Sequence, residues 1–366
     1  MLRRIVTIIG YVLLVAAIVV VVVLAHRGAE SHRNTQQVAG FSINVDGVDG
    51  FSLVDEMTMH SWFHAHNVHP EGRTVADVNL SELEGVALQH SAVAEANAYV
   101  TYDGYVQMNI VQREPIMRLR MEGYDSYLSR DGHLFATMRG YAAYVPVITG
   151  NYRMIFDGSF TGSVAEFTAD TLASLHREIE YCEHRKYPIY RDKSKARSRF
   201  KSVSDSTINR PIFMSDAKYE SLCEGLKLYK EAYAQRYEAQ DKEYDEAIAR
   251  LTAQQQQLYD KINEIRKRES DFRGLERFVN YVLADEFWSA EITQVVISES
   301  GNQTMQLSLI PRSGSFVVDM GDLNDIETKF SSLRLFYDKV LSSVGWDAYN
   351  HISLRYDGQV VCREAR

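Results

Sequence analysis

The sequence predicts an α+β protein with an N-terminal transmembrane helix, a small β-α-α-β-β domain, and then a strand-rich β domain interrupted by a helical insertion. Three observations support this fold class. An uncharged apolar run fills residues 5–24, two helix patterns lie among strand patterns in residues 41–113, and a heptad pattern fills much of residues 216–269. Strand patterns resume after that heptad stretch, which indicates an insertion within one domain.

The apolar run from Ile5 to Leu24 is long enough to cross a bilayer as one helix. Its twenty residues, at about 1.5 Å each, span a hydrocarbon core of roughly 30 Å. Arg3 and Arg4 precede the run, so the positive-inside rule places residues 1–4 in the cytoplasm and the bulk of the chain across the membrane. A cleaved signal peptide is the alternative. We assign residues 5–25 to the helix and residues 26–40 to a linker.

The patterns in residues 41–113 indicate a small α+β domain. Apolar and polar residues alternate in 41–46, helix patterns follow in 53–67 and 81–89, and strand patterns in 93–101 and 105–111 flank an Asp103-Gly104 turn. Ser81 and Glu84 fit a capping box, which predicts that the second helix begins at Ser81. This order predicts a small sheet with two helices on one face.

The strand-rich domain comprises residues 114–164 and 274–366. Its strand patterns are 116–121, 125–128, 134–137, 144–150, 292–298, 304–310 and 315–319. A helix over 327–344 places Phe330, Leu333, Tyr337, Val340 and Leu341 on one face. The last strand is expected over 352–362, with a bulge or kink at Gly358. We expect it to form a sheet edge that can accept a strand from a partner.

The insertion, residues 165–273, is expected to be mostly helical. Its basic stretch from Arg185 to Lys201 has few apolar residues and is expected to form a loop. From residue 216 to 269 a helix without proline carries a heptad seam made of Tyr244, Ile248, Leu251, Gln255, Leu258, Ile262 and Ile265. A straight helix of this length would extend about 80 Å, so it must project, bend or fold back as a hairpin. The seam packs either on its own protein or on a partner helix.

Residues that could carry chemistry are few. A net charge of −9 argues against a general nucleic-acid surface. His60, His64, His66 and His69 could bind zinc, but the glutamate of an H-E-x-x-H motif is missing, so an ordinary helix face is the preferred interpretation. No phosphate-binding loop or nucleophile motif is present, and three cysteines cannot all pair. We therefore predict no catalytic residue, metal site or cofactor.

Several short motifs occur in a characteristic order in both halves of the chain. They are Val111-Gln112-Arg113-Glu114-Pro115-Ile116, Tyr127-Leu128 before Asp131-Gly132, Val145-Pro146-Val147-Ile148-Thr149-Gly150, Asp285-Glu286-Phe287-Trp288, Gly345-Trp346 and Leu354-Arg355-Tyr356-Asp357-Gly358. In this order, behind an N-terminal apolar helix, they resemble the bacterial cell-division family FtsQ/DivIB, in the form found in Bacteroidota. The insertion has no counterpart in the resemblance.

The resemblance implies a fold and a function. Residues 41–113 would be a POTRA-like domain, and the protein a non-enzymatic, single-pass inner-membrane scaffold, mostly periplasmic, at the division septum. It would bind FtsB and FtsL and help to recruit or regulate septal peptidoglycan synthesis. The implied partner-binding residues are Leu354, Arg355, Tyr356, Asp357, Gly358, Gln359 and Val360. Tyr356 would contribute buried aromatic area, and Arg355 a salt bridge to an acidic partner. A POTRA-type scaffold for envelope assembly or secretion is the alternative.

Overall fold

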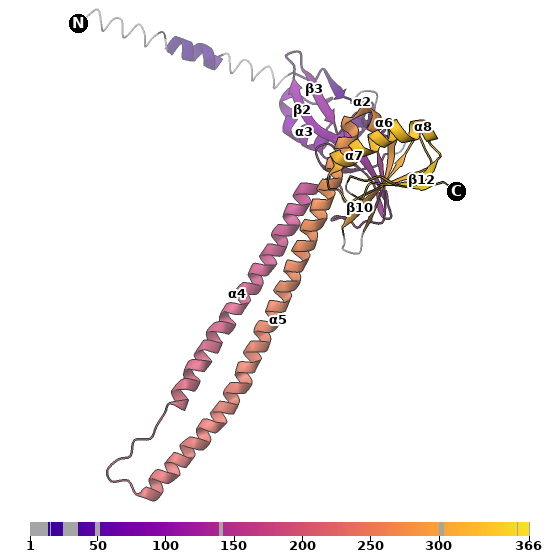
Figure 1. Cartoon of the computed structure of the whole chain (residues 1–366). Helices are drawn as coiled ribbons and strands as arrows, with labels where there is room; N and C mark the ends of the chain where they lie inside the picture. The colour runs from indigo at the N-terminus through magenta and orange to yellow at the C-terminus, as the bar shows by residue number, and fades with distance from the viewer. Residues whose placement is uncertain are drawn as a thin grey trace, which may run out of the picture. The chain divides into compact units, whose positions relative to one another are not determined.

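A computed structural model describes residues 14, 16–24, 36–47, 52–138, 142–299, 304–356 and 358–365 of the chain (Figure 1). Two compact units make up the structure. One unit consists of residues 165–275, and the other of the residues before and after that segment. The expected α+β class, with a strand-rich sheet and a long helical insertion, is confirmed.

The first elements form a three-stranded sheet with two α-helices. In chain order they are β1 (Gly40–Asp46), α2 (Glu56–Ala65), the short 3₁₀ helix η1 (Val75–Asp77), α3 (Leu80–Leu88), β2 (Val93–Val100) and β3 (Tyr105–Gln112). The sheet order is β1-β3-β2, with β1 parallel and β2 antiparallel to β3. The expected β-α-α-β-β order is therefore present.

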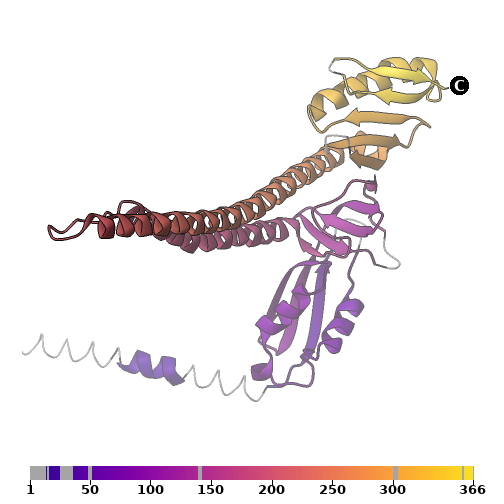
Figure 2. The ribbon, with the colours of Figure 1, turned by 90° about the horizontal axis from the view of Figure 1, so that it is seen from below.

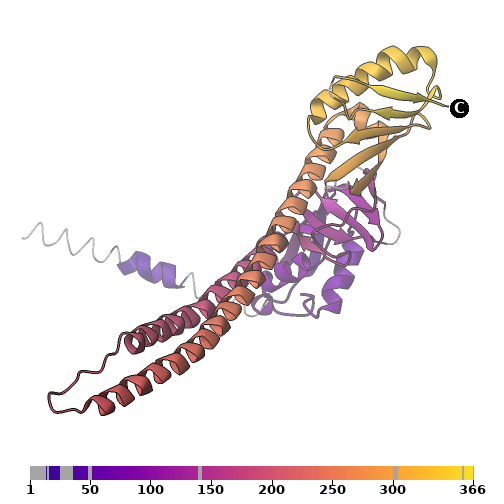
Figure 3. The same cartoon turned by 60° about the horizontal axis from the view of Figure 1, so that its bottom comes forward.

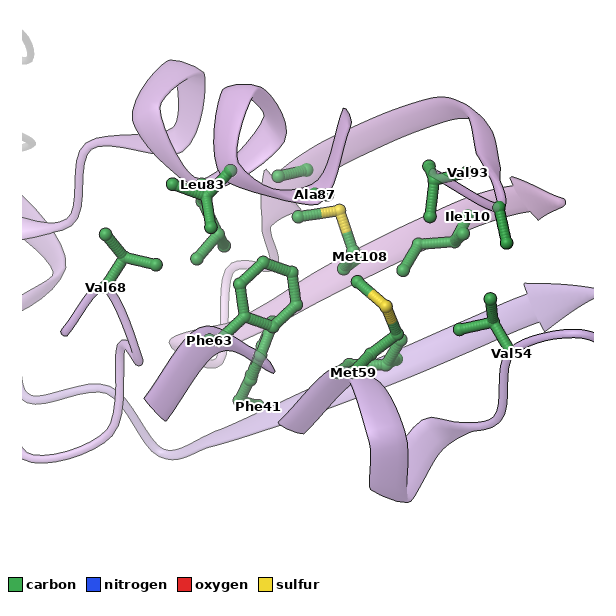
Figure 4. Packing of buried hydrophobic residues seen from close by; sticks show 14 of the residues in the cluster. Phe41, Val54, Met59, Phe63, Val68, Leu83, Ala87, Val93, Met108 and Ile110 are labelled. Atoms are coloured by element: carbon green, nitrogen blue, oxygen red, sulfur yellow. The ribbon is translucent and has the colours of Figure 1, made fainter. Parts of the chain in front are cut away.

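The core of this region lies between the helices and the sheet. Phe41 of β1, Met59 and Phe63 of α2, and Met108 and Ile110 of β3 point into a shared interior (Figure 4). Each of these side chains is buried, and Met59, Phe63, Met108 and Ile110 have no exposed surface. Removal of this apolar surface from water is the main term that stabilises the region.

The start of α3 differs from the expectation. Asn79 is the N-cap residue, and its side chain accepts a hydrogen bond from the Glu82 backbone N–H at 3.2 Å. Glu84, which a capping box would direct back to the start of the helix, instead accepts a hydrogen bond from the Ala98 N–H at 2.7 Å. The predicted capping box at Ser81 is therefore wrong, because Glu84 has a tertiary partner on β2.

The second sheet contains ten strands among the described residues, in the order β13-β12-β11-β10-β9-β7-β4-β5-β6-β8. Those before the insertion are β4 (Pro115–Met121), β5 (Tyr124–Ser129), β6 (His133–Ala136), β7 (Val147–Gly150) and β8 (Gly162–Ser163). Those after it are β9 (Ile292–Glu299), β10 (Met305–Pro311), β11 (Val317–Gly321), β12 (Tyr349–Ser353) and β13 (Val361–Glu364). The predicted strand patterns up to residue 319 all fall on these strands or overlap them.

The two halves of this sheet join where β7 pairs in parallel with β9. Gly150 lies opposite Ile297 in this pairing and has a φ of +124°. A Cβ at Gly150 would lie 1.8 Å from the Ile297 carbonyl oxygen, so the position requires glycine. Strands separated by the whole insertion thus form one continuous sheet.

Helices of the C-terminal segment pack around aromatic side chains. They are α6 (Glu286–Glu291), α7 (Ile326–Phe336), a π-helical turn η2 (Tyr337–Leu341) and α8 (Ser342–Val344). The Trp288 ring lies 4.9 Å from that of Phe330 and 5.6 Å from that of Tyr337, measured between ring centres. The predicted face of the 327–344 helix is mostly confirmed: Phe330, Leu333, Tyr337 and Leu341 are buried, and Val340 is half-buried.

The insertion is a helical hairpin of two long helices, α4 (Val164–Ser204) and α5 (Asp216–Ala284), which lie side by side (Figures 1, 2 and 3). The heptad seam of α5 faces α4: Leu251 and Ile262 are buried, and Gln255 donates a hydrogen bond to the Ile179 carbonyl of α4 at 3.2 Å. The helix predicted over 216–269 does not fold back on itself: it lies unbroken within α5 and packs along α4 of its own chain.

The basic stretch from Arg185 to Lys201 is helical, so the predicted loop is wrong. It lies within α4, which continues through Pro188. Lys193 pairs with Asp241 and Asp245 of α5, and the Phe200 ring stacks on that of Tyr237 with centres 4.4 Å apart. These partners are far along the chain, and only the hairpin brings them to the basic side chains.

Half of the predicted transmembrane segment, residues 5–24, falls outside the described residues. Ile5 and its neighbours up to residue 13 are not described, whereas Leu14 and residues 16–24, ending at Leu24, are helical and exposed. Within the part of the chain that is described, no helix has the length and apolar character needed to span a bilayer.

Candidate partner-binding surface at the C-terminal edge of the sheet

The C-terminal residues form two strands at one edge of the ten-stranded sheet. β12 pairs in parallel with β11, and β13 returns antiparallel to β12, with Ser353 opposite Val361 and Ile352 opposite Cys362. Within the described residues, β13 is the outermost strand on this side. The prediction of one strand over residues 352–362 is therefore wrong, although the chain does end on a sheet edge.

A turn between β12 and β13 accounts for the difference. The Leu354 N–H donates to the Asp319 carbonyl at 2.8 Å, so the chain still runs beside β11 at this residue. The Gln359 N–H then donates to the Tyr356 carbonyl at 3.1 Å, closing the turn, and Gly358 has a φ of +66°. A positive φ at Gly358 reverses the chain instead of producing the expected bulge.

Asp319, the third of the five residues of β11, holds the base of this turn. One of its carboxylate oxygens accepts a hydrogen bond from the Arg355 Nε at 2.8 Å, and the other accepts from the Gly321 N–H at 3.1 Å. Gly321 has a φ of +69°, and a Cβ there would lie 2.8 Å from Arg355 Cγ. The glycine therefore makes room for the Arg355 side chain as it crosses to Asp319.

The predicted site residues differ in exposure. Leu354 is buried, whereas Arg355, Gly358 and Gln359 are exposed and Val360 is half-buried. Tyr356 has 60% of its surface exposed, so most of the ring is available to a partner. Asp357 lies outside the described residues.

The turn and α7 border a partly open cavity of about 180 Å³. Leu354, Arg355, Tyr356, Gly358 and Gln359 line one side of it, and the lining on the other side comes from α7 and the loop before it: Asp322, Asn324, Asp325, Thr328, Lys329 and Ser332. Five of the seven residues predicted from the sequence thus meet in one hollow. Val360 is not part of the lining.

A lysine and an aspartate fix the far wall of the cavity. Lys329 Nζ donates to both the backbone oxygen and the Oδ1 of Asp322, each at 2.9 Å. Burial would raise the pKa of the Asp322 carboxyl, but hydrogen bonds from Lys329 and Asn324 outweigh it and hold the pKa below its usual value. The carboxylate is therefore ionised at neutral pH, and the loop before α7 is held in place.

Sequence reasoning assigned no role in the site to Asp319 or to the residues of the far wall. Asp319 and Gly321 are separated from the C-terminal motif by more than thirty residues, and only the parallel pairing of β11 with β12 brings them beside it. The available signal was the Asp319-Met320-Gly321 run at the end of a strand pattern, since an aspartate followed by a glycine is typical of a strand end that turns.

The histidines form a separate cluster on α2 and the following loop. His60 Nδ1 lies 3.0 Å from His69 Nε2, and the His64 ring stacks on that of His69 with centres 3.8 Å apart. Two of the imidazoles thus hydrogen-bond to one another. Among the residues that the structure describes, no group of three or more His, Cys, Asp or Glu side chains is arranged to hold a metal ion.

Residues 242–363 match a family model described as FtsQ/DivIB, C-terminal related. The C-terminal third of the chain is FtsQ/DivIB-related. The matched segment begins within α5, at residue 242, and ends in β13, so it contains Asp319, the whole β12–β13 turn and all residues that line the cavity. No curated protein matches the sequence. The family relationship indicates a role in cell division.

Proposed function

We propose that this protein is a non-enzymatic scaffold of the bacterial division complex that binds FtsB and FtsL through the C-terminal sheet edge. The observation that carries the proposal is that the family match ends in the outermost strand and includes the entire cavity beside it. The scaffold would hold these partners at the septum, where they help to recruit or regulate peptidoglycan synthesis.

Strand addition to β13 is the proposed mode of binding. An outermost strand presents one row of backbone N–H and C=O groups that a partner strand can pair with. Val361 of β13 is 46% exposed, so an added strand would also bury apolar side-chain surface. Backbone pairing would supply affinity, and side chains entering the neighbouring cavity would supply specificity.

Tyr356 is the proposed anchor residue, and Arg355 has a different role from the one the resemblance implies. The Tyr356 ring is mostly exposed at the mouth of the cavity, so a partner could bury most of its area. Arg355 already donates to Asp319 within the chain. We therefore assign Arg355 to positioning the turn, with its half-exposed guanidinium available to an acidic partner group.

Replacement of Tyr356 tests the binding surface. Tyr356→Ala should weaken binding of FtsB to the full chain by more than about 1 kcal/mol, because large aromatic side chains are typical hot spots. Affinity can be measured by calorimetry, with the melting temperature as a check on folding. The control is Tyr187→Ala, since Tyr187 is a 68% exposed tyrosine on α4, remote in sequence from the matched segment. Equal affinities for the two variants would refute the assignment.

We also propose that residues 5–24 anchor the chain in the inner membrane, with the bulk of the protein in the periplasm and residues 41–113 as a POTRA-like domain. The length and apolar composition of residues 5–24 support the anchor. Retention of the chain in the membrane fraction after alkaline extraction tests it. A mid-cell ring supports the division scaffold, whereas an even envelope distribution favours the alternative of an assembly or secretion scaffold.

A further inference from the structure

The helical hairpin separates opposite charges between its two helices in the half nearer the α4–α5 turn. Residues 185–201 of α4 contain eight Lys or Arg and one Asp, whereas residues 238–246 of α5 contain five Asp or Glu and one Lys. The two stretches lie side by side, because Lys193 forms ion pairs with Asp241 and Asp245. The hairpin therefore carries a basic row on α4 next to an acidic row on α5.

One side of the hairpin combines these rows with an exposed tyrosine. Residues three or four apart share one side of a helix, so Tyr190, Lys193 and Arg197 follow one another along the same side of α4. Tyr190 is 50% exposed, and Arg197 is exposed and has no ion-pair partner among the described residues. On α5, Asp245 and Ala249 are likewise four apart. Because Lys193 pairs with Asp245, both sets of residues lie on the same side of the hairpin.

A shallow hollow of about 470 Å³ runs along α5 on this side and is open to solvent. Its lining consists of Tyr237, Glu238, Asp241, Lys242, Asp245, Glu246 and Ala249. Four of these side chains are acidic, one is basic, and the alanine at one end leaves room for a larger side chain to approach the helix. The hollow therefore suits an aromatic ring that is accompanied by cations.

A second copy of the hairpin carries the complementary surface. A two-fold axis parallel to the hairpin places α4 of each copy against α5 of the other, with equal residues at equal heights. Since α4 and α5 run in opposite directions, the Lys193 ion pairs place Tyr190 level with the residues just after Asp245, and Arg197 level with those just before Asp241. In such a pair, Tyr190 of one copy meets Ala249 of the other, and Arg197 meets Glu238, which is exposed.

We propose that two copies of this chain associate through this side of the hairpin, with Tyr190 of each copy in the hollow of the other and Arg197 of each paired with Glu238 of the other. An anionic polymer fits less well, because the acidic row beside the basic one would repel it. Contact over about fifteen residues of each helix, roughly 22 Å long and two helix widths across, would bury roughly 450 Å² per copy. An interface of this size is typical of transient complexes, so the pair is a reversible one.

Photocrosslinking of the full chain tests the proposal, because it captures transient pairs. Tyr190 is replaced by benzoylphenylalanine, and the yield of crosslinked dimer is measured by gel electrophoresis. The matched control is the same replacement at Tyr181, which is 63% exposed on α4. Position 181 lies about two and a half turns before position 190, so the two side chains point to opposite sides of the helix. We expect several-fold more dimer at position 190 than at position 181.

Exchange of charges shows whether the contact is made between copies. Arg197→Glu and Glu238→Arg, each made in the chain with benzoylphenylalanine at position 190, should each reduce the dimer yield several-fold. An equimolar mixture of the two variants should recover it, because each replaced side chain then faces the opposite charge on the other copy. Arg199→Glu is the charge control, since Arg199 is exposed on the other side of α4, and it should leave the yield unchanged.

Two results would overturn the proposal: equal dimer yields at positions 190 and 181, or a mixture that yields no more dimer than either charge variant alone. Neither readout depends on FtsB binding at the sheet edge, because every replaced residue lies in the hairpin.

Discussion

Gln255→Leu should destabilise the helical hairpin, although it places an apolar residue in an apolar seam. Gln255 is 5% exposed and Lys186 is 6% exposed. In the interior of the hairpin the Gln255 Oε1 accepts a hydrogen bond from the Lys186 ammonium, and its Nε2 donates to Glu183 at 2.8 Å and to the Ile179 carbonyl at 3.2 Å. Leucine can replace none of these bonds.

The size of the stability loss depends on Lys186, which loses Gln255 as an acceptor. A buried charged donor that loses an acceptor costs about 1–3 kcal/mol. Lys186 keeps Glu183 at 3.5 Å, and its flexible stem can move toward solvent, so we expect a net loss of about 2 kcal/mol from the free energy of unfolding. The double variant with Lys186→Met removes both polar partners and should recover most of this loss, because a well-packed apolar pair often equals a buried polar one.

Urea denaturation of the full chain, followed by far-ultraviolet circular dichroism, measures the effect. The matched control is Gln256→Leu, because the Gln256 side chain is exposed. Its Nε2 donates to the Asp260 carboxylate, one helical turn away, at 2.9 Å. It should change stability by less than about 0.5 kcal/mol. The reasoning would be refuted if Gln255→Leu were as stable as wild type, or if the double variant were no more stable than Gln255→Leu.

Three further predictions concern the other regions. Gly321→Ala should lower stability by about 1–2 kcal/mol and weaken FtsB binding, because alanine is strained at a positive φ and its methyl group would clash with the Arg355 side chain. An unchanged affinity in calorimetry would contradict this prediction. Asn79→Ala should lower the free energy of unfolding, measured by chemical denaturation, by about 1 kcal/mol, whereas Ser81→Ala should change it little. A larger loss for Ser81→Ala would support the capping box at Ser81 instead. Burial and the neighbouring imidazoles lower the pKa of His69 below its usual value of 6.5, so its contribution to stability is complete above about pH 6.5 and is lost as the pH falls below it. His69→Gln should therefore flatten the pH dependence of the denaturation midpoint, and parallel curves would exclude this cause.

The strands were predictable because their signal is local. Alternation of apolar and polar residues is set by the geometry of each strand, so β1, β3 and β10 lie within a residue or two of their predicted positions. The Asp103-Gly104 turn was predictable for the same reason, and Gly104 has the positive φ that such a turn needs. The capping box failed because Glu84 responds to β2, fourteen residues further along the chain.

Part of the candidate site was predictable, and part was not. The C-terminal motif indicated residues 354–360, and five of these line the cavity. Their partner Asp319 lies 36 residues earlier in the chain, and a pattern read within one strand carries no information about a neighbouring strand. The same limit explains the division of the last predicted strand into β12 and β13, because only pairing with β11 and β12 fixes where each one ends.

By itself, the sequence determined most of the strands and helices, that a long helical stretch interrupts the second sheet, and that the C-terminal motif is FtsQ/DivIB-like. Each of these depends on periodicity or on short motifs, which act over a few residues. Only the tertiary structure decided that the basic stretch of α4 is helical, that α5 folds back on it, and that the turn after β12 faces α7 across a cavity. These features depend on ion pairs, buried polar contacts and strand pairing between residues far apart in the chain, and such contacts exist only once the chain has folded.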